Sequence, residues 1–256
     1  MKHAPAAVLG AATVVLLVGP LLLPDPDAAD FAALLAGPSA AHPLGTDQLG
    51  RDLLARVVDG GRLTIGLSLL TVLVTGLTGV AVGLLAAATG VVGQALIRVV
   101  DVLAAIPVVL FGLLAAVVLG PGIASVLIAV SLIGWTPFAR QTYLLALVES
   151  GRDYVSGAVS LGAGPVRVLV RHVGPNIAAP LAAHARVRFA ATLLTISGLS
   201  FLGLGVQPPT AEWGAMVAEG REYLFTAPQV VLVPSIAVVL TAGAVAWWGR
   251  SRTNES

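Results

Sequence analysis

The chain has 256 residues, of which 57% are hydrophobic and only 11% are charged, and its mean hydropathy is +0.95. A soluble domain of this size needs more polar surface to cover its core, so the composition indicates an integral membrane protein. The net charge of +1 comes without a basic block, which argues against nucleic acid as a partner. The absence of cysteine excludes disulfides, thiol catalysis and cysteine-ligated zinc.

The amino-terminal quarter predicts one membrane span followed by an outer segment. Residues 4–23 are uncharged, about the length that a helix needs to cross a bilayer, and the acidic turn Pro24-Asp25-Pro26-Asp27 follows them. A cleaved signal peptide is the alternative, but its apolar core is usually shorter. We therefore predict that residues 1–62 contain a first transmembrane helix and an extracytoplasmic segment. Within it, residues 46–59 are expected to form an interfacial helix that ends at Gly60-Gly61.

Two long uncharged stretches follow, and glycine divides each of them. Residues 64–89 predict the second span, because Gly90 supplies a break after it. Gly120-Pro121-Gly122 separates a third span at residues 99–119 from a fourth at residues 123–139.

The last third of the chain predicts a fifth span at residues 177–200 and a sixth at residues 230–248. The predicted fold is therefore an all-α integral membrane protein with six transmembrane helices. Its core is expected over residues 63–249, with a cytoplasmic tail at residues 250–256.

Basic residues set the expected orientation, since cytoplasmic loops retain more Lys and Arg than outer loops do. With the amino terminus inside, the inner side holds Lys2, Arg98, Arg140, Arg152, Arg167, Arg171, Arg250 and Arg252. The outer side holds Arg51, Arg56, Arg62 and Arg221, together with most of the acidic side chains. We expect both termini in the cytoplasm.

The loop between the fourth and fifth spans, about residues 150–175, contains a short amphipathic helix. Its expected apolar face recurs at i, i+3, i+4 and i+7 and comprises Val166, Leu169, Val170 and Val173. Arg167 and Arg171 lie on another face, and Gly162-Ala163-Gly164 separates this helix from an earlier one near residues 153–161. Asn176 is expected to cap the fifth span. A helix lying on the membrane surface is the alternative interpretation.

Several sites of chemistry are excluded by what the chain lacks. Lys2 is the only lysine, so no Gly-rich loop that ends in Gly-Lys-Ser/Thr can exist. The four histidines are scattered, and no Gly-x-Ser-x-Gly elbow is present. We expect no catalytic, cofactor-binding or metal-binding residues. The remaining classes are a channel, a pathway subunit energised by another protein, and a scaffold.

The same loop resembles the EAA loop of binding-protein-dependent ABC importer permeases, in the branch that carries oligopeptides, dipeptides and nickel. The resemblance rests on Tyr154-Val155, Leu161-Gly162-Ala163 and Arg171-His172-Val173-Gly174-Pro175-Asn176. In that family the loop forms coupling helices that dock on a cytoplasmic ATPase. The resemblance therefore implies ATPase-coupling roles for Tyr154, Ser156, Gly157, Ala158, Gly162, Arg167, Arg171 and His172.

Four further motifs resemble the same branch in the same order, so that the resemblance covers about residues 42–248. They are residues 42–52 (HPLGTDQLGRD), the set Arg98, Asp101, Ile106 and Pro107, residues 135–140 (WTPFAR), and residues 199–210 (LSFLGLGVQPPT) with Glu212-Trp213-Gly214. By resemblance, Gly203, Gly205, Pro208 and Pro209 belong to an outer gate.

Two departures from the family pattern stand out. Ser156-Gly157-Ala158 replaces the usual Glu-Ala-Ala, so a weakly coupled subunit stays open as an alternative. Arg186 and Arg188 fall in the predicted fifth span, where a charge at mid-bilayer costs about 2.5 to 3.5 kcal/mol. Either both side chains snorkel to the inner interface, or one of them faces the pathway and favours an anionic or carboxylate-bearing solute. Both cannot share a face, because residues two apart point about 200° away from each other.

The resemblance implies a permease subunit in the bacterial inner membrane, and not an enzyme. Its expected partners are two cytoplasmic ABC ATPase subunits, a second homologous permease subunit, an extracytoplasmic solute-binding protein and the lipid bilayer. No cofactor is expected on this chain, and ATP is expected to be used by the partner subunits. Peptides are the first choice of solute and nickel the second. A passive channel or a non-transporting scaffold is the alternative function.

Overall fold

The computed structural model describes residues 15–16 and 18–253, and these residues form helices, turns and one isolated bridge between Thr46 and Asp52. The long helices are α2 (Leu53–Ala88), α3 (Val91–Ala104), α4 (Val108–Leu119), α5 (Ile123–Gly134), α6 (Thr136–Ser150), α9 (Gly174–Phe201) and α11 (Gln229–Thr253). The short helices are α7 (Asp153–Ser160), α8 (Pro165–Val168), the π-helix η1 (Leu169–Val173), α10 (Trp213–Gly220) and the 3-10 helix η2 (Arg221–Tyr223).

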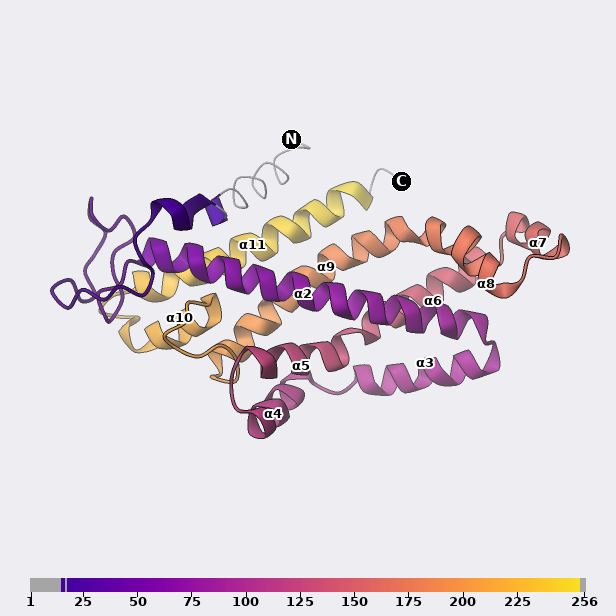
Figure 1. The fold of residues 1–256 in the computed structure, drawn as a ribbon, viewed down its shortest axis with the longest axis horizontal. Helices are drawn as coiled ribbons and strands as arrows, with labels where there is room; N and C mark the ends of the chain where they lie inside the picture. The colour runs from indigo at the N-terminus through magenta and orange to yellow at the C-terminus, as the bar shows by residue number, and fades with distance from the viewer. Residues whose placement is uncertain (1–14, 17, 254–256) are drawn as a thin grey trace.

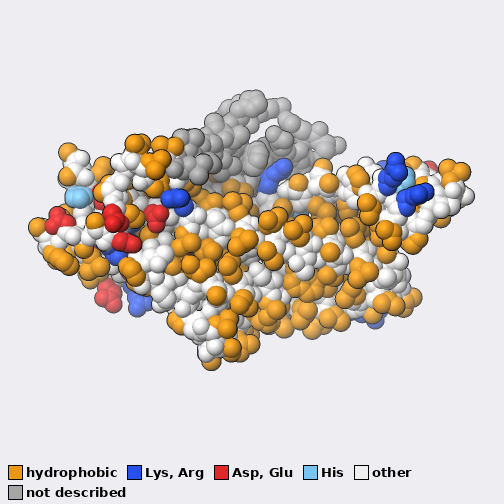
Figure 2. Space-filling model, in the orientation of Figure 1, with side chains coloured by type: hydrophobic (Ala, Val, Ile, Leu, Met, Phe, Trp, Pro, Cys, Tyr) orange, Lys and Arg blue, Asp and Glu red, His pale blue; other side chains and the backbone are white. Residues whose placement is uncertain are grey.

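Among the described residues, three helical segments are long and apolar enough to cross a membrane: Leu53–Ala88, Ile123–Ser150, which contains α5 and α6, and Gln229–Trp247. The helices α3 and α4 make a fourth candidate if the bent pair is one span. In Figure 1, α2, α9 and α11 run along the long axis of the molecule. Figure 2 shows hydrophobic side chains over the middle of one face, with acidic and basic side chains gathered toward its two ends. An apolar belt between charged ends is the surface that a bilayer requires.

These three or four candidates fall short of the six predicted spans for two reasons. Helix α9 has 28 residues, or about 42 Å at 1.5 Å per residue, but it carries His184, Arg186 and Arg188 and is therefore less apolar. The predicted first span, residues 4–23, lies mostly outside the described residues, of which 15–16 and 18–22 are helical.

The predicted interfacial helix that ends at Gly60-Gly61 is wrong, because both glycines lie inside α2. A Cβ atom on Gly60 would lie 3.3 Å from the backbone of Ala211 and Glu212, and one on Gly61 would lie 2.7 Å from the ring of Trp213. These glycines therefore let α2 approach another segment closely, and they do not end the helix.

The third predicted span, residues 99–119, is also not a straight helix. The chain turns at Gly90, as predicted, where φ is +55°, and α3 begins directly afterwards. Helices α3 and α4 then meet at an angle of 75°. Pro107 explains the bend, since proline has no N–H to donate and disfavours helical geometry in the residue before it.

Helix α6 extends the predicted fourth span from residue 139 to Ser150. It packs tightly against α2, since a Cβ on Gly79 would lie 2.4 Å from the Cβ of Phe138, and one on Gly83 would lie 2.5 Å from the carbonyl oxygen of Ala139. Small residues of this kind are what allow two helix backbones to approach in a membrane.

Two apolar clusters lie near opposite ends of the helices. The α10 cluster joins α2, α9, α10 and α11 and includes Leu53, Leu193, Trp213, Met216 and Val230. The loop cluster joins α6, α7, α8, η1 and α9 and comprises Ala146, Val155, Val168, Val173 and Ile177. The candidate functional segments are built on these two clusters.

Candidate functional site

The predicted coupling loop forms one end of the molecule. After α6 ends at Ser150, α7 and α8 project at the end opposite α10, as Figure 1 shows. The loop returns through η1 directly into α9, so that residues 165–201 form a helical run without a break. The loop therefore connects α6 and α9 through the three short helices α7, α8 and η1.

A glycine reverses the chain between α7 and α8. Gly162 has φ of +87°, and the N–H groups of Gly162 and Ala163 donate to the carbonyls of Val159 and Ala158 at 2.9 and 3.0 Å. This is a Schellman motif, which favours glycine at the left-handed position. The bend predicted at Gly162-Ala163-Gly164 is confirmed.

The predicted apolar face of the amphipathic helix is only half right. Val173 is buried and Leu169 is partly buried, as expected, but Val166 and Val170 are 73% and 69% exposed. Val168 is buried in their place. The cause is a change of helix type, because a period of 3.6 residues does not continue through the π-helix that begins at Leu169.

The tip of the loop therefore exposes apolar and basic side chains together. The large exposed apolar side chains are Val159, Leu161, Val166 and Val170. Arg167, Arg171, Ser156, Gly157 and Gly162 are exposed as well, while Ala158 and His172 are half-buried. Leu161 is 91% exposed, and Figure 2 shows basic side chains gathered at this end. Clustered exposed apolar groups of this kind are typical of surfaces that contact another protein or a membrane.

Tyr154, another predicted coupling residue, is hydrogen-bonded within the chain. Its hydroxyl donates to Oε1 of Glu149 at 2.5 Å and accepts from Nδ2 of Asn176 at 2.8 Å. The hydrogen bond that Tyr154 donates to the Glu149 carboxylate raises the pKa of its hydroxyl. The expected N-cap role of Asn176 is wrong, because Asn176 lies inside α9 and its amide donates to the carbonyl of His172 at 2.6 Å.

The predicted outer-gate residues come together where α9 ends. Gly203 has φ of +78°, and the N–H of Leu204 donates to the carbonyl of Leu199 at 3.0 Å, which makes a second Schellman motif. Gly205 lies against Ser200, where a Cβ would come within 2.2 Å of the hydroxyl oxygen. The peptide bond between Pro208 and Pro209 is cis.

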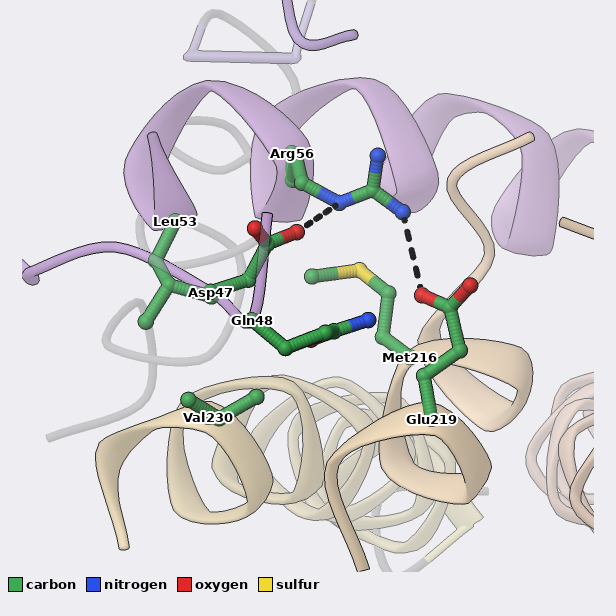
Figure 3. A pocket seen from close by; sticks show the side chains of 7 residues that line it. All are labelled: Asp47, Gln48, Leu53, Arg56, Met216, Glu219 and Val230. Carbon is green, nitrogen blue, oxygen red and sulfur yellow. Dashed lines mark hydrogen bonds and ion pairs between the residues drawn. The ribbon is translucent and has the colours of Figure 1, made fainter. Parts of the chain in front are cut away.

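A buried arginine fastens this outer turn to three other segments. Arg56 is 1% exposed and donates to the carbonyl of Pro209 at 3.3 Å and to Asp27 at 3.0 Å. It also pairs with Asp47 and Glu219, both at 3.4 Å, and Figure 3 shows its guanidinium between these two carboxylates. The sequence placed Arg56 only among the outer charges. The acidic and basic side chains of residues 42–56 were the available signal for a buried network.

A buried carboxylate organises the neighbouring motif Glu212-Trp213-Gly214. Glu212 is fully buried and caps α10, where it accepts from the N–H of Ala215 at 2.9 Å. The hydroxyls of Thr64 and Ser197 also donate to it, at 3.0 and 3.4 Å. The indole N–H of Trp213 donates to the carbonyl of Val57 at 2.8 Å. The motif therefore holds α2, α9 and α10 together at the end opposite the loop.

His184 and Arg188 lie on one face of α9, and Arg186 lies on another. His184 and Arg188 are one turn apart, and the ring of His184 meets that of Phe138 edge-on at 5.1 Å. Phe138 precedes Arg140 by two residues, and Arg140 pairs with Asp101 on α3. His184 thus lies near the level of that ion pair, with Arg188 about 6 Å further along the helix. Among the described residues, the buried atoms Nε2 of His184 and Nε of Arg188 have no hydrogen-bond partner.

Known proteins resemble the chain over most of its length. Residues 79–248 match the family described as binding-protein-dependent transport system inner membrane component. The di/tripeptide transport system permease protein DppC of Pseudomonas aeruginosa is 38% identical over 82% of this chain and 70% of its own length. The glutathione transport system permease protein GsiD of Pectobacterium atrosepticum is 38% identical over 83% and 71%.

The fold agrees with these relatives. A structure of the inward-facing MetNI methionine ABC transporter matches with a TM-score of 0.62 and 16% identity, over 77% of this chain and 95% of that one. The resemblance seen in the sequence is therefore confirmed, and the chain is a transporter membrane subunit and not an enzyme. With a family match over residues 79–248 and relatives 38% identical over more than four fifths of its length, the chain belongs to the inner membrane permease components of binding-protein-dependent ABC importers.

Proposed function

We propose that this chain forms the solute pathway of an ATP-driven importer together with a second homologous permease subunit. In this proposal six helices cross the inner membrane, both termini lie in the cytoplasm, and residues 150–175 are the coupling loop. The separation of charge supports the orientation, because the exposed loop arginines 152, 167 and 171 lie at one end and the carboxylates Asp27, Asp47 and Glu219 at the other.

The exposed tip of the loop is the observation that carries the proposal. Leu161, Val166 and Val170 are exposed next to Arg167 and Arg171, at the end of the molecule that the loop forms. Such a surface suits a cytoplasmic ATPase that covers the apolar groups and supplies acidic partners. ATP is bound by that partner and not by this chain. One ATPase for each permease gives two in the assembly.

A peptide is the solute that we propose. The relatives named above are di/tripeptide and glutathione permeases, and both kinds of solute carry carboxylates. Arg188 and His184 are the side chains that suit a carboxylate, because buried nitrogen atoms on them lack partners within the described chain. Arg186 lies on another face of α9 and is the second candidate. Nickel remains the second choice of solute, and no residue cluster described above favours it.

At the outer end, the turn that contains Gly203, Gly205, Pro208 and Pro209 is the proposed outer gate. Its anchors, Arg56 and Glu212, tie it to α2 and α10, so that the turn and these helix ends move together. An extracytoplasmic binding protein would deliver solute to this end. A passive channel or scaffold would need none of these partners, and the family assignment disfavours both.

Replacing Leu161 with Asp tests ATPase docking. The change removes an exposed apolar side chain from the interface and introduces a negative charge that the acidic side chains of the ATPase repel. Recovery of the ATPase with this chain should therefore fall at least tenfold, which corresponds to about 1.4 kcal/mol. Leu161→Met, which keeps the apolar contact, is the matched control. Undiminished ATPase recovery with Leu161→Asp, from mild detergent and at equal permease yield, would refute the docking surface.

A further inference from the structure

Three segments of the chain meet at one phenol group in the coupling loop. Tyr154 on α7 donates to Glu149, which lies one residue before the end of α6, and accepts from Asn176 in the first turn of α9. The second N–H of the Asn176 amide donates to the carbonyl of His172 in η1. The side chains of Tyr154 and His172 also lie next to each other, with ring centroids 6.3 Å apart.

The network lies in the first two turns of α9, where two residues lack a backbone donor. Pro175 and Pro180 both fall within the first seven residues of α9, and neither can donate a backbone hydrogen bond. The π-helix η1 precedes them directly, with Gly174 N–H bonded to the carbonyl of Leu169 five residues earlier. The side-chain amide of Asn176 supplies a hydrogen-bond donor to this region, and its second bond, to the Tyr154 hydroxyl, holds the amide in place.

Few other contacts hold α7. Among the residues of α7, all of which the structure describes, Val155 alone is buried. Its partners are the loop-cluster residues of α6, α8, η1 and α9. The hydroxyl of Tyr154 therefore provides the polar half of the attachment, and Val155 provides the apolar half.

We infer that Glu149, Tyr154 and Asn176 form a latch that makes α7 move together with the ends of α6 and α9. Tyr154 is then a positioning residue, which acts through its neighbours and not by touching the ATPase. The inference rests on the proposed function, because the latch has a purpose only if a partner pushes on α7. It also explains how a loop that has Ser156 in place of the usual acidic residue can pass a movement of α7 on to α6 and α9.

Tyr154→Phe removes the hydroxyl and keeps the ring. In reconstituted importer, we expect normal recovery of the ATPase and normal basal hydrolysis, but about fivefold to tenfold less solute carried per ATP, the equivalent of losing about one net hydrogen bond. Glu149→Gln retains an acceptor and should keep most of the coupling, whereas Glu149→Ala should not. Ser160→Ala is the matched control, since the Ser160 hydroxyl bonds only within α7, to the carbonyl of Ser156.

Distance measurements test the latch without the ATPase. The chain has no cysteine, so spin labels can be placed at Gly157→Cys on α7 and Ala178→Cys on α9, both exposed positions. Tyr154→Phe should broaden the distance distribution between the two labels, and Ser160→Ala should not.

The two proposals fail in different ways. Wild-type solute per ATP and an unchanged distance distribution in Tyr154→Phe would overturn the latch. Loss of ATPase recovery in Tyr154→Phe would overturn it as well, because Tyr154 would then contact the ATPase directly. If the wild-type chain recruits no ATPase, the proposed function fails, while the label distances still decide whether Tyr154 holds α7 to α9.

Discussion

Replacing Gly79 with alanine has two opposing effects, because it overpacks the contact between α2 and α6 and raises the helix propensity of α2. A Cβ at this position would lie 2.4 Å from both the Cβ of Phe138 and the carbonyl oxygen of Trp135. Ordinary van der Waals contact begins near 3.4 Å, so α2 and α6 must separate by about 1 Å to admit one methyl group. The backbone of α6 cannot move aside as a flexible side chain would.

The magnitude follows from two opposing terms. Overpacking of this kind costs about 1 to 3 kcal/mol, and the backbone contact puts Gly79→Ala near the upper value. Alanine is a better helix former than glycine by about 1 kcal/mol, which offsets part of the loss. The net destabilisation is therefore about 2 kcal/mol. At Gly66, on the same helix, no atom lies within 4 Å of the added Cβ, so Gly66→Ala should gain up to about 1 kcal/mol.

Thermal unfolding of the two variants in detergent measures the difference. About 3 kcal/mol between them corresponds to a difference in Tm of about 5 to 10 °C, with Gly79→Ala the less stable. Equal Tm values for the two alanine variants would show that α2 and α6 do not touch at Gly79, and the tight packing of these helices would be refuted.

Three further predictions concern the buried polar groups. Glu212→Ala removes a helix cap and two hydroxyl partners, so stability in detergent should fall by about 1 to 2 kcal/mol, whereas Glu222→Ala at an exposed position should change it by less than about 0.5 kcal/mol. Arg56→Gln removes one of the two buried arginines that pair with Asp47 and Glu219, while Arg51 remains as their cation, so the free energy of unfolding should fall by about 2 kcal/mol; an unchanged Tm would contradict the network. Arg188→Gln should reduce uptake of peptides with a free carboxylate more than uptake of amidated ones, and Arg186→Gln should not change this preference; equal effects of both variants would exclude Arg188 as the carboxylate ligand.

The sequence alone predicted the features that depend on short stretches of chain. Apolar composition identified the membrane protein, and long apolar runs located α2, α5 and α11. Gly90 and Gly162 marked turns correctly, because left-handed backbone favours glycine wherever it occurs. The order of the motifs identified the family, which the similarity to DppC and GsiD confirms.

Tertiary structure decided which residues face one another. Gly60 and Gly61 look like a helix end in the sequence, yet they allow α2 to pack against a segment about 150 residues later. Val166 and Val170 were assigned to a buried face, yet both are exposed, because Val166 lies in α8 and Val170 lies within the π-helix that follows it. A period of 3.6 residues cannot anticipate a change of helix type.

The same limit applies to the charged and polar side chains at the two ends of the molecule. Arg56 bonds to the carbonyl of Pro209, 153 residues away, and Tyr154 to Asn176, 22 residues away. The sequence by itself determined that these side chains exist near the membrane surfaces, because charge is excluded from the lipid interior. Only the folded chain decided their partners, since an ion pair or hydrogen bond depends on distances of about 3 Å that no spacing along the sequence specifies.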